Sequence, residues 1–227
     1  MRFILSFRQP ENYIQMSNPP KKNRSKTSQA WLNEHVNDPF VHLAQKEGYR
    51  ARAAYKLLEI NEKYNLLRPN MTIVDLGSAP GSWSQVVARK LGKSATVFAL
   101  DILPMDAIDG VTFIQGDFRE ETVLQQLENA VGEKAVDLVI SDIAPNMSGN
   151  TVTDQAKSFY LCELALDFAR NHLKNGGDFL IKVFQGAGFN EYMRALKSSF
   201  AKTISVKPKA SRGRSNEIYL LGRGFIR

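Results

Sequence analysis

The chain has 227 residues, 43% hydrophobic and 23% charged, which excludes a wholly disordered protein and fits one medium-sized domain. It carries 30 Lys and Arg against 23 Asp and Glu, and this excess of positive charge favours a polyanionic partner such as nucleic acid. A single cysteine excludes an intrachain disulfide. The three histidines lack metal-ligand spacing, so we predict no metal site.

Residues 1–28 are predicted to form a flexible, basic N-terminal arm, and residues 29–227 a single domain. The arm contains the polar stretches NPP and KKNRSK, which are typical of an unpacked segment. Its first letters, MRFILSF, are too short to span a membrane and lack a signal-peptide cleavage site, so we expect a cytoplasmic protein. Helical spacing follows and ends before Arg68 and Pro69.

From residue 72 onward, strand patterns alternate with helix patterns. Strands are expected at 72–76, 96–101, 111–114, 136–141 and 179–184, and helices at 82–91, about 119–130, about 154–174 and about 189–200. Several strands are apolar on both faces, which predicts a parallel sheet covered on two sides, a doubly wound α/β fold. The last strands, TISV and EIYLLG, are joined by a basic loop too short for a parallel crossover, so we expect an antiparallel hairpin.

The stretch TIVDLGSAPGSW joins a strand to a helix through a glycine-containing bend, the local arrangement that cradles nucleotides. It does not match the dinucleotide fingerprint. Counted from Gly77, the second and third glycine positions hold Ala79 and Ser82. The bend therefore predicts a ligand-binding site but does not identify the ligand.

Carboxylates lie at or just after the carboxyl ends of four of the predicted strands, and these ends meet at the edge where open α/β sheets bind ligands. They are Asp75, Asp101, Asp117 and Asp142. Asp101 stands about twenty residues beyond the bend, where an acid commonly accepts the hydroxyl hydrogens of a ribose, and Asp117 could meet an adenine amino group. Because no phosphate-binding motif is present, a nucleoside without phosphates is indicated, which points to S-adenosylmethionine.

Lys182 interrupts the apolar strand FLIKVF, where burying a lysine without partners would be costly. A desolvated lysine can serve as a base, although a lysine that snorkels at a strand end is the structural alternative. Asp142 and Glu217 are expected at the same edge and would hold Lys182. Trp83 could be either a core anchor or a wall of the pocket.

Four motifs together resemble the FtsJ/RrmJ family of ribose 2′-O-methyltransferases: DLGSAPGSWSQ, SDIAPNMSG, FLIKVFQG and KPKASRGRSNEIYLLG. The resemblance runs from about Ser25 to Phe225 and implies a Rossmann-like methyltransferase fold. It implies a catalytic tetrad of Lys56, Asp142, Lys182 and Glu217, in which Lys56 comes from the resemblance alone. It also implies that S-adenosylmethionine, which leaves as S-adenosylhomocysteine, is bound through Gly81, Trp83, Asp101, Asp117 and Asp142.

The motifs are most similar to the bacterial branch of this family, which implies methylation of an A-loop uridine of 23S rRNA in the large ribosomal subunit. We expect a monomer. Ser82 stands where the family usually has glycine. Residues 1–15 lie outside the resemblance, since similar chains begin at Met16, and we assign them no function.

Four alternatives stay open. The chain could methylate the ribose of tRNA or another RNA, or it could be a non-catalytic RNA assembly factor that retains the cofactor fold. Base N-methylation is disfavoured because DIAPN has one proline and no aromatic residue. A nicotinamide oxidoreductase is disfavoured by the incomplete glycine fingerprint.

Overall fold

The structure is a computed structural model that describes residues 36–227, so the predicted arm at 1–28 lies outside the described residues. Residues 37–227 form one compact unit. Within the part of the chain that the structure describes, no helix is both long and apolar enough to cross a membrane.

The unit begins with two helices, α2 (Pro39–Glu47) and α3 (Ala54–Tyr64). The Asp38 side chain caps α2 by accepting a hydrogen bond from the backbone N–H of Phe40, which satisfies one donor that the first helical turn leaves without a partner. Asn65 ends α3 in the left-handed conformation that asparagine tolerates better than most residues. The sequence placed the end of this helical region slightly later, before Arg68.

A seven-stranded sheet follows, with strand order β3-β2-β1-β4-β5-β7-β6. Its strands are β1 (Thr72–Leu76), β2 (Thr96–Asp101), β3 (Val111–Gln115), β4 (Val136–Ser141), β5 (Leu173–Phe184), β6 (Phe200–Val206) and β7 (Glu217–Phe225). The first five strands are parallel, and β7 runs antiparallel to both β5 and β6. The predicted doubly wound sheet with a C-terminal antiparallel hairpin is confirmed.

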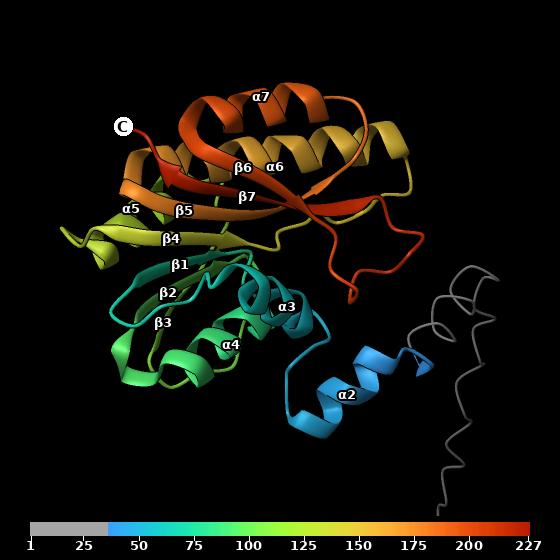
Figure 1. Cartoon of the computed structure of the whole chain (residues 1–227), viewed down its shortest axis with the longest axis horizontal. Helices are drawn as coiled ribbons and strands as arrows, with labels where there is room; N and C mark the ends of the chain where they lie inside the picture. Colours follow the sequence, from blue (N-terminus) through green and yellow to red (C-terminus); the bar gives the residue numbers. More distant parts are fainter. Residues whose placement is uncertain (1–35) are drawn as a thin grey trace, which may run out of the picture. The chain divides into compact units, whose positions relative to one another are not determined.

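Helices cover both faces of the sheet (Figure 1). One face packs against α5 (Glu121–Val131), α6 (Thr151–His172) and α7 (Phe189–Ser199), and the other packs against α3 and α4 (Ser82–Leu91). The short 3₁₀ helix η1 (Gly92–Ser94) leads into β2. Two apolar cores therefore enclose the sheet, which explains why its central strands are apolar on both faces.

Several boundaries differ from the sequence prediction, among them the starts of α6 and β5. Helix α6 begins three residues earlier than expected because the Asn150 side chain accepts hydrogen bonds from the backbone N–H groups of Val152 and Thr153. Strand β5 begins at Leu173, six residues before the expected start at 179. A register shift opposite β4, with Gly176 at φ 81°, absorbs this irregular start.

The strand order reverses between β1 and β4, which are neighbours in the sheet although two strands separate them in the sequence. In open α/β sheets a crevice forms outside the carboxyl ends of the strands at such a switch point, and ligands bind there. The ligand site is therefore expected among the loops after β1, β2, β3 and β4.

Candidate active site

A cavity of about 440 Å³ lies outside the carboxyl ends of these strands, within the size range of small-molecule sites. The bend after β1 contributes Gly77 and Ala79 to its wall. Three carboxylates and several apolar side chains complete much of the lining: Asp101, Asp117, Asp142, Ile102, Leu103, Phe118 and Leu161. The strand-end acids predicted from the sequence therefore meet in one cavity, except Asp75.

Asp101 ends β2 and joins two loops of this wall. One carboxylate oxygen accepts a hydrogen bond from the backbone N–H of Ala79, and the other accepts one from the N–H of Leu103, each at 2.8 Å. A carboxylate oxygen has more than one acceptor site, so Asp101 could hold the loops and still accept a ligand hydroxyl.

Asp117 follows β3 and faces Arg119. The Arg119 Nε donates to Asp117 Oδ1 at 2.9 Å, and this hydrogen bond lowers the pKa of Asp117 below its ordinary value. The acid is therefore charged at neutral pH and lies at the cavity wall, where its expected role is to receive hydrogen bonds.

Gly81 and Trp83 are placed differently from the three acids. Gly81 precedes α4 and Trp83 lies in its first turn, and neither is among the described residues that line the cavity. The Trp83 indole is buried, donates to the Ala53 carbonyl at 2.9 Å and packs against the Tyr219 ring. In this structure Trp83 is a core anchor that joins α3 to α4.

Asp75 lies beneath the bend rather than in the cavity. Its side chain is buried and accepts a hydrogen bond of 2.6 Å from the Ser84 hydroxyl. Burial favours the neutral acid and raises the pKa of Asp75 to about 7, while the Ser84 bond acts in the opposite direction. Its second carboxylate oxygen and the hydroxyls of Ser78 and Ser82 are buried polar atoms without a hydrogen-bond partner, which marks the bend as polar on the inside.

Lys182 and Asp142 meet beside the cavity. The Lys182 Nζ lies 3.1 Å from the Asp142 carboxylate and donates to the Asp142 carbonyl at 2.6 Å. Burial alone would raise the pKa of Asp142, but Lys182 and Lys56 outweigh it, so the pKa lies below its ordinary value. Lys182 is therefore paired with an ionised acid that also lines the cavity.

Lys56 and Glu217 form the second pair of the cluster, 2.8 Å apart. The sequence placed Glu217 with Lys182, whereas its salt bridge is to Lys56. Burial acts to raise the pKa of Glu217, and the Lys56 ammonium outweighs it and lowers that pKa. All four residues of the expected tetrad come together from α3, the β4 end, β5 and the β7 start.

Tyr219 joins the two pairs and is a site residue that the sequence reasoning missed. Its hydroxyl donates to Asp142 Oδ1 at 2.6 Å, and the Lys56 Nζ lies 5.4 Å from its ring centroid, within cation–π range. The sequence offers one weak signal, since Tyr219 is two residues beyond Glu217 on the same strand face. Its pairing with Lys182 in the β5–β7 register is seen only in the structure.

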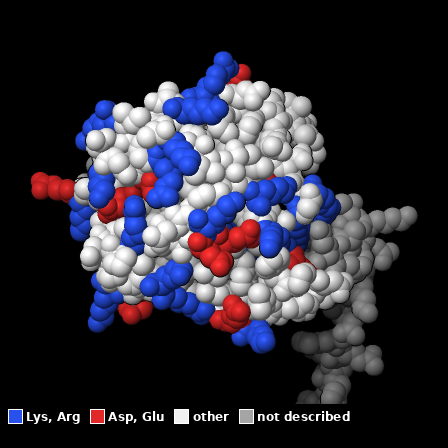
Figure 2. Space-filling view, viewed as in Figure 1, with Lys and Arg blue, Asp and Glu red and all other residues white. Residues whose placement is uncertain are grey.

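A second hollow, also of about 440 Å³, opens on the other side of the tetrad. Its lining includes Lys56 and Glu217 together with Arg52, Arg212, Arg214 and Ser215. Figure 2 shows basic side chains gathered over the region of the β6–β7 loop, with acidic side chains between them. A hollow lined by basic side chains that ends at a buried lysine suits a ligand that places its negative charges near the entrance and a hydroxyl group at the inner end.

Part of the basic charge predicted to face a polyanion is used inside the protein. The Arg50 guanidinium donates to three backbone carbonyls, and that of Arg52 bonds to the Asp38 carboxylate and the Ala210 carbonyl. The basic loop at 207–214 is also fastened to α3, because the Lys209 N–H donates to Glu59 at 2.7 Å. Hydrogen bonds of basic residues thus connect the elements that surround the two hollows.

A switch-point cavity lined by acids, next to a buried pair of lysines and a basic hollow, defines a group-transfer protein of the Rossmann-like class. The model of the FtsJ-like methyltransferase family matches residues 49–225. This match covers most of the chain, which therefore belongs to the FtsJ-like methyltransferase family. Members of such a family need a methyl donor.

Curated relatives agree with this assignment. The chain is 67% identical over 200 residues to ribosomal RNA large subunit methyltransferase E of Neisseria gonorrhoeae, covering 88% of this chain and 97% of the relative. It is 64% identical to the protein of the same name in Chromobacterium violaceum, covering 88% and 98%. A Plasmodium falciparum crystal structure described as a ribosomal RNA methyltransferase has a TM-score of 0.70 and 33% identity, covering 78% and 98%.

Proposed function

We propose that the chain methylates the ribose 2′-hydroxyl of a uridine in the A-loop of 23S rRNA, within the large ribosomal subunit. The observation that carries this proposal is the tetrad itself: Lys182 with Asp142 and Lys56 with Glu217, placed between an acid-lined cavity and a basic hollow. The names of the curated relatives support rRNA as the substrate.

The cavity fits S-adenosylmethionine as methyl donor. Asp101 would accept the ribose hydroxyls, Asp117 would meet the adenine, and Asp142 lies where the cavity meets the tetrad. The carboxylates of Asp101, Asp117 and Asp142 give the cavity wall acceptors for a polar, cationic ligand. When bound, S-adenosylmethionine supplies a methyl group on a positively charged sulfur, and S-adenosylhomocysteine remains.

Lys182 would contact the 2′-hydroxyl as its oxygen takes the methyl group from sulfur: either the Lys182 amine accepts the hydroxyl proton, or the Lys182 ammonium holds the oxygen and the proton passes to water. Its amine already donates to the Asp142 carbonyl and faces an ionised carboxylate, which supports the holding role. Lys56 would orient the ribose from the basic hollow, and Glu217 would fix Lys56. Positioning of this kind supplies a large part of the rate in reactions that need little covalent work from the protein.

The basic hollow would receive the RNA backbone. Arg52, Arg212 and Arg214 line it together with Lys56 and Glu217, so phosphates there would place a ribose beside the tetrad. Both hollows and the tetrad are built from one chain, which supports action as a monomer. The substrate in turn supports a cytoplasmic location, where bacterial ribosomes work.

The proposal is tested by incubating the full chain with methyl-labelled S-adenosylmethionine and separate 23S rRNA, tRNA and large-subunit fractions. Mass spectrometry of nuclease digests then locates the methyl group. We expect label on a ribose of one 23S rRNA uridine, mainly in the subunit fraction. Label confined to tRNA, or found on a base, would overturn the substrate or the reaction, and no transfer at all would favour an assembly factor.

A further inference from the structure

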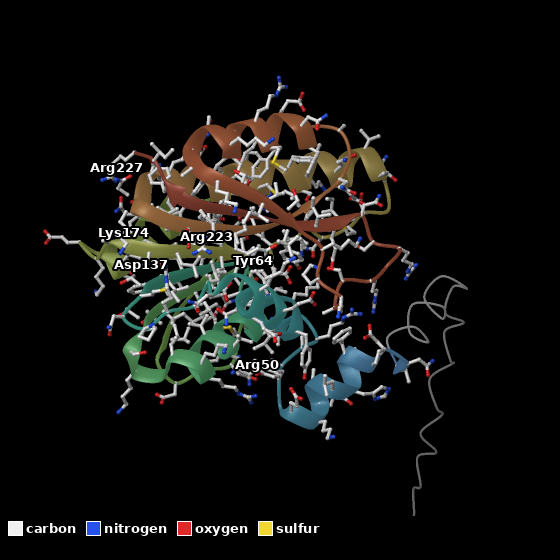
Figure 3. All side chains as sticks on the ribbon, in the orientation of Figure 1. Arg50, Tyr64, Asp137, Lys174, Arg223 and Arg227 are labelled. Atoms are coloured by element: carbon white, nitrogen blue, oxygen red, sulfur yellow. The ribbon has the colours of Figure 1, made fainter. Side chains whose placement is uncertain are left out.

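Arg50 bridges two loops that lie far apart in the sequence. Its guanidinium donates to the carbonyls of Pro80 at 2.9 Å, Asp106 at 2.7 Å and Ala107 at 2.9 Å. Pro80 belongs to the bend after β1, and the other two carbonyls belong to the loop after β2. Figure 3 shows Arg50 close to α4, the helix that follows the bend in the sequence.

The segment that carries Arg50 is itself fastened to α4. The backbone N–H of Arg50 donates to the Gln85 side chain at 2.9 Å, and the Gln85 amide donates back to the Gly48 carbonyl at 2.9 Å. Arg89, one turn further along α4, donates to the carbonyls of Glu47 and Gly48. The backbone at Arg50 is therefore held by hydrogen bonds to α4. The three hydrogen bonds of the guanidinium restrain the positions of the two loops relative to this backbone.

The same two loops form the wall of the acid-lined cavity through Ala79, Ile102 and Leu103. Asp101 ties them together at the cavity by accepting the N–H groups of Ala79 and Leu103. Arg50 ties them through carbonyls of neighbouring residues and does not line the cavity. Two side chains of opposite charge therefore join the loops of the wall: Asp101 accepts hydrogen bonds from backbone N–H groups, and Arg50 donates hydrogen bonds to backbone carbonyls.

Gly81 provides the space for the Arg50 side chain. A Cβ atom at Gly81 would lie 2.7 Å from an Arg50 guanidinium nitrogen and 2.7 Å from the Met105 sulfur, closer than van der Waals contact allows. Gly81 also has a φ of 98°, which disfavours any side chain. The positive φ therefore favours glycine at this position, and a side chain here would also have to displace the end of the Arg50 or Met105 side chain.

We propose that Arg50 is a positioning residue for the methyl-donor cavity: it holds the loops after β1 and β2 at the separation that the donor needs. This inference rests on the proposed function only in taking S-adenosylmethionine as the ligand. If Arg50 is lost, fewer molecules have a binding-competent cavity, and the apparent affinity falls in proportion to that fraction.

The basic character of YRAR suggests a different role, contact with RNA phosphates. The structure argues against it for Arg50, because three of its five donor hydrogens are already bonded to backbone carbonyls and at most two remain for a phosphate. The two roles differ in measurable ways: a positioning residue changes donor binding, whereas a phosphate contact changes RNA binding and its salt dependence.

The test compares the full chain with its Arg50→Ala and Arg50→Lys variants, with Arg194→Ala as the control. Arg194 lies on α7, is 74% exposed and pairs with the nearby Glu191, so its loss removes the same charge at a distant site. Calorimetry gives the Kd for S-adenosylmethionine and S-adenosylhomocysteine, and steady-state assays give the KM for donor and RNA separately.

For Arg50→Ala we expect about a tenfold rise in donor Kd and KM, with an unchanged KM for RNA and an unchanged salt slope. Arg50→Lys keeps the charge but loses the fork that reaches several carbonyls, so a rise of about threefold is expected. Arg194→Ala should match wild type. Thermal unfolding is measured first, and if the alanine variant does not fold, the lysine variant decides the test.

The outcomes separate the two proposals. Wild-type protein that binds no S-adenosylmethionine overturns the proposed function and this inference with it. Wild-type binding with unchanged donor Kd in a folded Arg50 variant overturns the inference alone. Weaker RNA binding with a reduced salt slope and normal donor binding also overturns it, because it identifies Arg50 as a phosphate contact.

Discussion

Lys56 on α3 and Glu217 at the start of β7 form a salt bridge of 2.8 Å in which their side chains are only 10% and 12% exposed. The Lys182–Asp142 pair is buried to a similar degree, with side chains 9% and 19% exposed. Two lysine amines and two carboxylates thus form one largely buried cluster. The Tyr219 hydroxyl donates a hydrogen bond to one of the acids. Removing any single charge leaves its partner without compensation.

We predict that Glu217→Gln destabilises the protein, because Lys56 would lose its counter-charge in a nearly buried position. The expected loss is about 2 kcal/mol in the free energy of unfolding, measured by urea titration at pH 7. Lys56 lowers the pKa of Glu217 below its ordinary value of 4.5. The stabilisation of the folded state by this salt bridge is therefore complete above pH 4.5 and is lost as the pH falls through the lowered pKa.

Glu191→Gln is the matched control for that measurement. Glu191 pairs with Arg194 on the α7 surface and is 68% exposed, so its loss should cost at most about 0.5 kcal/mol. Equal effects of the two substitutions would contradict the view that the Lys56–Glu217 pair is a structural part of the cluster.

Lys182→Ala is predicted to abolish methyl transfer while the donor still binds. The proposed roles of Lys182, holding the hydroxyl or removing its proton, correspond to a loss of at least about 10²-fold in kcat. The donor Kd should change much less, because Asp101 and Asp117 remain at the cavity wall. Lys197→Ala, an exposed position on α7, controls for the loss of a lysine. Full activity of the Lys182 variant would exclude Lys182 from the chemistry.

The sheet and the strand-end acids could be predicted from the sequence because both follow from local patterns. Apolar strands separated by helices imply parallel pairing, and parallel pairing brings the carboxyl ends to one edge. Asp101, Asp117 and Asp142 consequently meet in the cavity. Asp75 is one residue from its strand end, and its side chain is buried against Ser84 instead.

Lys56 and Tyr219 could not be predicted in this way, because their roles depend on contacts between distant elements. A lysine within a helix pattern is normally solvated, and only the β7 start beside α3 buries Lys56 and pairs it. A tyrosine in an apolar strand is normally a core residue, and only the β5–β7 register brings its hydroxyl to Asp142. The resemblance supplied Lys56, whereas Tyr219 required the structure.

Asp75 predicts a specific pH dependence of stability. Burial raises the pKa of Asp75 to about 7 from the ordinary 3.8, so folding favours its protonated form. Its contribution to stability is therefore complete below the ordinary pKa and is lost as the pH rises through about 7. Asp75→Asn, which cannot ionise, should gain stability relative to wild type between pH 5 and pH 8.

Urea unfolding of wild type and Asp75→Asn at pH 5 and pH 8 measures this difference. Asp137→Asn serves as the control, because Asp137 is a strand acid paired with Lys174 and lies away from the bend. A difference between wild type and Asp75→Asn that does not change with pH would contradict the raised pKa.

Arg214→Ala is predicted to weaken RNA binding through the loss of a phosphate contact. Arg214 lies in the β6–β7 loop and lines the basic hollow next to Lys56 and Glu217, while the acid-lined cavity is formed by other residues. Loss of one phosphate contact lowers the slope of log affinity against log salt by about 1. Titration of a 23S rRNA fragment at several salt concentrations measures the slope, with Arg194→Ala as the charge-matched control. The donor Kd of Arg214→Ala should equal that of wild type, and weaker RNA binding at an unchanged slope would mean that Arg214 acts on the loop conformation rather than on phosphate.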